Sequence, residues 1–88
     1  MAITKNDARK AVRALLKASG ELAHAAELVQ PDPDDPAVAS YRRAIARIIM
    51  AIFEELSIPL YSRYPDLIPE REREVVEAAL RRSERDSK

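Results

Sequence analysis

The chain has 88 residues, which is enough for one domain and too few for two. A chain this short buries only about 60–65% of the surface that its unfolded form exposes, so its core is thin. Such chains commonly need a disulfide, a metal ion or a partner. There is no cysteine, which excludes a disulfide and makes a cytoplasmic location the expectation.

The charges and the hydropathy pattern exclude further classes. The 15 basic and 15 acidic residues cancel, so net charge gives no support for a nucleic-acid or anionic-membrane partner. The longest strongly apolar run, residues 48–53, is far shorter than the ~20 residues of a membrane span, and no signal peptide is expected. Ala, Leu, Glu and Arg are abundant and glycine occurs once, which predicts one all-α domain over residues 1–88.

The first predicted helix covers residues 4–29. Thr4 is a favourable N-cap, and Asp7 stands three residues later, as in a variant capping box. A stripe of small and apolar residues follows at spacings of three and four, until Pro31 ends the helix. Gly20 could break it, but the stripe keeps its phase across this glycine, so we predict one continuous helix.

The segment 31–36 contains three prolines and three aspartates and predicts a stiff turn. Asp35 before a proline is typical of an N-cap and the first helical position. A calcium loop of the EF-hand type beginning at Asp32 would need glycine and glutamate where Ala37 and Arg43 stand. We therefore interpret the aspartates as turn-forming and capping residues.

The second predicted helix covers residues 36–57 and is apolar over an arc of roughly 200°. A helix with one neighbour needs only ~100°, so this helix must contact neighbours on at least two sides. The residues predicted to lie in the core or in an oligomer contact are Tyr41, Ile45, Ile48, Ile49, Ile52, Phe53 and Leu56. The remaining strip, with Arg43, Arg47, Met50 and Glu54, is expected to face water.

Alanines recur every seven residues on both predicted helices. The two columns consist of Ala11, Ala18 and Ala25, and of Ala37, Ala44 and Ala51. Small side chains let helix backbones approach closely, and a short loop favours antiparallel packing. We predict that the columns face each other in a tight antiparallel helical hairpin; the alternative is that alanine is merely a good helix former.

The stretch 59–68 allows two interpretations. Pro59 either kinks the second helix or begins a short new one, and Pro65 ends it. The large residues of this stretch either close the end of the core or form a surface for a protein partner. The partner-surface candidates are Leu60, Tyr61, Tyr64 and Leu67.

A third helix is predicted over residues 69–84, with a frayed tail over 83–88. Its apolar stripe is thin, consisting of Val75, Val76, Ala79 and Leu80. Because this helix covers little of the second helix, we predict that the chain completes its core as a homodimer, in a dimeric helical bundle.

Glu21-x-x-His24 is the main candidate for metal chemistry. Glu-x-x-His on a bundle helix supplies two ligands in ferritin-like di-iron proteins, and Glu55 could add a third. His24, however, falls on the side of the helix opposite the apolar stripe, where a buried metal centre could not use it. We predict no metal site and no cofactor.

A basic face of the first helix is the second candidate, as a site for nucleic acid or another anion. With three arginines of the second helix it comprises Lys5, Arg9, Lys10, Arg13, Lys17, Arg42, Arg43 and Arg47. Overall neutrality and the lack of interleaved aromatic residues favour an ordinary solvated helix face.

The chain has few of the residues that enzymatic catalysis requires. Cysteine is absent, the serines have no neighbouring histidine pattern, and one glycine cannot form a phosphate-binding loop. The sequence therefore predicts a non-enzymatic module for self-association or protein–protein interaction, with no membrane partner. The biological role and the identity of a protein partner are not encoded in any motif.

Overall fold

The computed structural model describes residues 3–86, and the side chains of residues 3–82. Its α-helices are α1 (Lys5–Glu27), α2 (Pro36–Ala51), α3 (Ile58–Arg63) and α4 (Arg73–Asp86). A π-helical turn, η1 (Ile52–Ser57), joins α2 to α3, and the 3-10 turns η2 (Pro65–Leu67) and η3 (Glu70–Glu72) lead to α4. Residues 3–86 contain no strand, and the predicted all-α class is confirmed.

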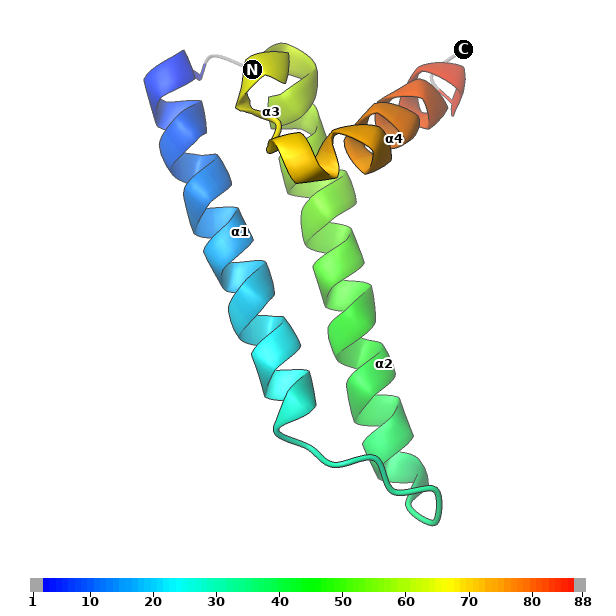
Figure 1. The fold of residues 1–88 in the computed structure, drawn as a ribbon. Helices are drawn as coiled ribbons and strands as arrows, with labels where there is room; N and C mark the ends of the chain where they lie inside the picture. The colour runs from blue at the N-terminus through cyan, green and yellow to red at the C-terminus, as the bar shows by residue number, and fades with distance from the viewer. Residues whose placement is uncertain (1–2, 87–88) are drawn as a thin grey trace.

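Helices α1 and α2 are long, lie side by side and run in opposite directions, while α4 begins beside α2 near α3 and extends away from α1 (Figure 1). The Thr4 side chain accepts a hydrogen bond of 3.2 Å from the Asp7 N–H, which confirms the predicted N-cap of α1. Gly20 lies inside α1 without a break, as its neighbours' helical phase predicts.

The turn between α1 and α2 is held by its own aspartates. The Asp32 carboxylate accepts from the Asp34 N–H at 3.0 Å, and the Asp35 carboxylate accepts from the Ala37 N–H at 3.0 Å. These bonds confirm the capping and turn interpretation. Across the turn, the Arg42 guanidinium donates to the carbonyls of Ala26 and Val29 at 3.0 and 2.8 Å, next to the negative end of α1.

The structure resolves the two interpretations of Pro59. The helical backbone continues from α2 through η1 into α3, where Pro59 stands in the first turn. The Ile58 N–H bonds the Phe53 carbonyl five residues earlier, which is the π-helical pattern. Because proline has no N–H and its ring crowds the preceding turn, one wide turn immediately before Pro59 keeps the helix going.

The third predicted helix differs at both ends. Glu70–Glu72 form a 3-10 turn, so the α-helix begins at Arg73 and not at Pro69. It continues to Asp86, into the segment that the sequence predicts to fray; residues 87–88 lie outside the described residues. The two 3-10 turns before α4 follow from Pro65 and Pro69. Each proline lacks an N–H and so interrupts the hydrogen bonds of an α-helix.

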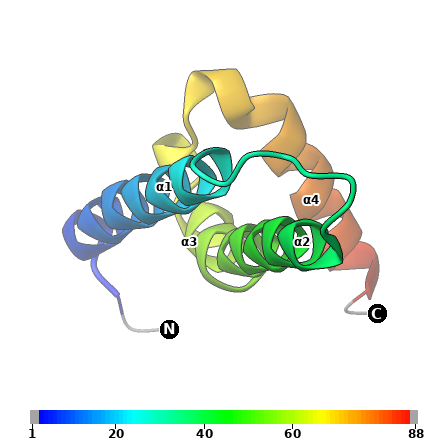
Figure 2. The same cartoon turned by 90° about the horizontal axis from the view of Figure 1, so that it is seen from below.

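The core lies at one end of the α1–α2 pair, where α3 stands between the first half of α1 and α4 and residues of all three helices form one buried cluster (Figures 1 and 2). Its buried residues are Ala8, Val12, Ile58, Leu60, Tyr61, Ile68, Val76 and Ala79. The Tyr64 hydroxyl donates to the Ile3 carbonyl at 2.6 Å and ties this end together.

This burial corrects the partner-surface candidates. Leu60 and Tyr61 are 5% and 1% exposed, and Tyr64 and Leu67 pack against the core half-buried. The interpretation as a partner surface is therefore wrong for Leu60 and Tyr61, which are buried in the core, and stays a prediction for Tyr64 and Leu67. The reversal of the chain at η2 folds the segment back onto α1, which a reading of local spacing does not reveal.

Outside this end the chain is thinly packed. Its extents are 46 × 30 × 24 Å and its radius of gyration is 15.3 Å, against about 12 Å for a compact domain of this length. Along the rest of the α1–α2 pair, within the described residues, Ile45 is the one fully buried hydrophobic residue. Over this part of their length, α1 and α2 thus contact mainly each other. The apolar arc of α2 is wider than the surface that α1 covers.

Candidate self-association surface

Large apolar side chains remain exposed on α2 and η1. Ile48 and Leu56 are each 50% exposed and Tyr41 is 41% exposed, while Ile49, Ile52 and Phe53 are half-buried. Ile45 alone among the predicted core or oligomer residues is fully buried. The exposed members still touch α1 in part, because the Tyr41 hydroxyl donates to the Ala25 carbonyl at 3.5 Å and Leu56 lines a groove with residues of α1.

The alanine columns do not form the centre of the α1–α2 contact. Ala18 and Ala37 are exposed, so the prediction that they lie between the helices is wrong. The other members, Ala11, Ala25, Ala44 and Ala51, are half-buried. The buried residues of α1 and α2 are Ala8, Val12 and Ile45, and none of them belongs to the two alanine columns.

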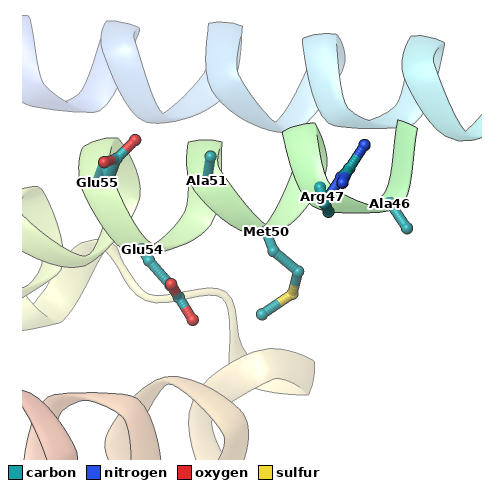
Figure 3. Close-up of a pocket in the computed structure, with 6 residues that line it drawn as sticks. All are labelled: Ala46, Arg47, Met50, Ala51, Glu54 and Glu55. Atoms are coloured by element: carbon teal, nitrogen blue, oxygen red, sulfur yellow. The ribbon is translucent and has the colours of Figure 1, made fainter. Parts of the chain in front are cut away.

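One edge of α2 combines small, apolar and charged residues. Arg47, Ala51 and Glu55 project to the same side of the helix, whereas Met50 and Glu54 project to the other (Figure 3). A shallow groove of about 340 Å³ lies along this part of α2 and η1. It is lined by Ala46, Arg47, Met50, Ala51, Glu54 and Glu55. We call the surface formed by five residues of α2 and η1 the open face: Arg47, Ile48, Ala51, Glu55 and Leu56.

A second groove continues from the open face towards α1. Glu55 and Leu56 line it, together with apolar residues of α1 and with Leu60, and its volume is about 340 Å³. The α1 contribution consists of Ala11, Ala14 and Leu15. Glu55 thus stands between the two grooves, and the surface runs across both long helices.

A third groove, of about 330 Å³, lies on the other side of α2. Met50 and Phe53 line it opposite Val75, with Leu16 from α1. The ribbon of η3 and α4 lies on this Met50 side (Figure 3). Helix α4 therefore approaches α2 on the side that carries Met50, although Met50 itself remains 49% exposed, and the open face is flanked by α1 instead.

The candidate metal ligands are not brought together. Glu21, His24 and Glu55 are all exposed, and His24 Nδ1 lies 3.9 Å from the Glu27 carboxylate instead. Among the residues with described side chains, no three His, Asp or Glu side chains are grouped as a metal ion requires. Nothing in this arrangement favours a ferritin-like site.

The basic face is divided by internal contacts. Arg42 is half-buried and is engaged with the end of α1, and Lys5 forms an ion pair with Asp66. The other basic residues, Arg9, Lys10, Arg13, Lys17, Arg43 and Arg47, are exposed on two helices. The continuous phosphate-binding stripe that the sequence allowed therefore loses Arg42, because its charge serves to cap α1.

Among residues 3–82, two ionisable groups have shifted pKa values, and both belong to the packed end. Burial, with a smaller contribution from the Glu72 carboxylate, raises the pKa of Tyr61. The hydrogen bond from Lys5 lowers the pKa of the Asp66 carboxyl, so that acidification removes this contact. Each shift follows from a contact that holds the fold together, and neither group lines the open face.

Comparisons with protein families, with curated proteins and with solved structures give no match to this chain. Within residues 3–86, no helix combines the length and the apolar character that crossing a bilayer requires. Sequence periodicity signalled the excess apolar arc of α2, but it did not show that Arg47, Ala51 and Glu55 lie on the side of α2 away from α4.

Proposed function

We propose that this chain is a non-enzymatic interaction module that acts by self-association, as a homodimer formed through the open face and the adjoining groove. The exposed surface area supports the proposal most directly. A folded monomer of 9.9 kDa is expected to expose about 5,200 Å², whereas this chain exposes 6642 Å². The chain thus exposes roughly 1,400 Å² more surface than expected. This difference is larger than the ~800 Å² that each partner buries in a standard interface.

The composition of the uncovered surface favours association over simple elongation. Ile48 and Leu56 are half exposed beside small residues, and packing them against a second copy would remove apolar area from water at about 25 cal/mol per Å². The aliphatic character of this side agrees with the more apolar interfaces of homodimers. A cytoplasmic module of this kind needs neither a metal ion nor a disulfide to complete its core.

Sedimentation equilibrium at micromolar concentration tests the proposal. We expect a mass near twice 9.9 kDa, decreasing on dilution as a reversible dimer dissociates. A monomeric mass together with a cooperative thermal transition would contradict the proposal, because the chain would then be stable with the open face in water.

A pair of matched variants locates the contact. Ile48→Glu places a charge in the contact of both copies, and we expect the dissociation constant to rise at least a hundredfold. Leu28→Glu alters a residue that is 69% exposed next to the loop, and we expect the dimer to persist. Equal effects of the two variants would mean that association uses another surface.

A further inference from the structure

The open face carries opposite charges at equal spacing from a small residue. Arg47 precedes Ala51 by four residues and Glu55 follows it by four. The three side chains project to the same side of the helix (Figure 3). The charge pattern is therefore reversed from one end of the strip to the other, with the smallest side chain in the middle.

From this arrangement we infer that two copies pair with their α2 helices antiparallel, on a two-fold axis at Ala51, so that Arg47 of each copy meets Glu55 of the other. The inference rests on the proposed self-association and specifies its geometry. A two-fold axis makes residue contacts reciprocal, so one such arrangement gives two ion pairs.

The charges discriminate between this geometry and its competitors. A parallel pairing in register would place Arg47 against Arg47 and Glu55 against Glu55. An antiparallel pairing with the axis at Arg47 would also oppose the two arginines. Like charges brought together across an interface are unfavourable, which leaves the axis at Ala51 as the register that satisfies both charged residues.

The apolar residues agree with the same axis. Ile48 and Leu56 are eight residues apart, like Arg47 and Glu55, and their midpoint lies one residue from Ala51. In the antiparallel pair, Ile48 of one copy falls opposite Glu54 of the other, and Leu56 lies two residues, about 3 Å along the helix, beyond it. Ala51 at the crossing point permits a short distance between the helix axes, near the lower end of the ~8–10 Å range.

The charged side chains are accessible, although α1 runs along the side of α2 to which they project (Figure 3). Helix α4 and η3 lie on the Met50 side of α2, where Met50 and Val75 line the same groove. Arg47 and Glu55 are exposed, and among the described side chains neither takes part in an ion pair. Both charged groups are thus available to a second copy.

Cysteine crosslinking tests the register directly, because the natural chain has no cysteine. Ala51→Cys places one thiol of each copy at the two-fold axis, where the Cα–Cα distance can fall within the ~4.4–6.8 Å that a disulfide needs. We expect mild oxidation to crosslink most of this variant. The matched control, Ala39→Cys, changes an exposed alanine twelve residues earlier on α2, and we expect no crosslink.

Charge reversal tests the ion pairs. Arg47→Glu and Glu55→Arg are each expected to raise the dimer dissociation constant roughly tenfold at low salt, because two contacts per dimer become repulsive. The double variant R47E/E55R restores complementarity and should return within about threefold of the parent. Arg13→Glu makes the same change in charge on exposed α1 and should have no effect.

The outcomes separate the two proposals. A dimer in which Ala51→Cys fails to crosslink and both charge reversals are neutral would overturn this geometry and leave self-association intact. A parent chain that stays monomeric at micromolar concentration would overturn self-association, and the geometry with it.

Discussion

The two ends of the α1–α2 pair are built from similar helices but are packed very differently. At one end, residues of α1, α3 and α4 share one core, and Tyr61 and Val76 are almost fully buried. Towards the other end, the helices have only each other, and Ile48 and Tyr41 remain exposed. Helical propensity is shared by both ends, so the number of neighbouring elements decides how much of each apolar face is buried.

We infer from this contrast that the two ends of the chain have different roles. The packed end supplies the core on which folding depends, while the open face retains apolar area that a second copy can bury. A chain of 88 residues has too few residues to cover both sides of a helix as apolar as α2. The predictions below test how far the two regions differ in energy.

The largest expected effect comes from truncating the centre of the packed end. Tyr61→Ala removes a side chain that is 1% exposed, and we expect the free energy of unfolding to fall by about 3–5 kcal/mol. Urea denaturation at a fixed chain concentration measures this change. Tyr41→Ala, which truncates the same residue type at 41% exposure, should cost less than about 1 kcal/mol. Similar losses would mean that the two regions are equally packed.

An intermediate effect is expected where the open end is tied together. Arg42→Met keeps most of the aliphatic stem but removes both hydrogen bonds to the carbonyls at the end of α1. We expect a loss of about 1.5–2 kcal/mol in the free energy of unfolding. Arg43→Met changes an exposed neighbour and should cost less than about 0.5 kcal/mol. If the two variants lose the same free energy of unfolding, the Arg42 hydrogen bonds add nothing to stability.

The smallest effect is expected midway along α1. A Cβ added at Gly20 would meet nothing within 4 Å, so Gly20→Ala should raise the free energy of unfolding by about 0.5–1 kcal/mol. The reverse exchange, Ala23→Gly at an exposed position of the same helix, should lower it by a similar amount. A destabilising Gly20→Ala would indicate that α1 needs a flexible point between the packed and the open end.

The positions of the helices were largely predictable, because local chemistry determines them. Thr4 and Asp35 cap α1 and α2 in the structure as their sequence positions indicate. The breadth of the apolar arc on α2 also pointed to an uncovered side before any packing was known. These features depend on residues within one or two turns of each other, and such contacts can be read from spacing.

The assignment of faces was predicted less well. Ala18 and Ala37 were expected between the helices and are exposed, whereas Leu60 and Tyr61 were candidates for a surface and are buried. The π-helical turn before Pro59 was not predicted, although the proline itself indicated an interruption. In each case the outcome depends on which distant segment packs against the residue.

The sequence by itself determined that this chain is helical, where its main helices begin, and that α2 carries more apolar surface than one neighbour can cover. The tertiary structure alone decided that the core gathers at one end and that Arg47, Ala51 and Glu55 lie on the side of α2 away from α4. Capping and propensity act over a few residues, but burial depends on neighbours that are distant in the chain.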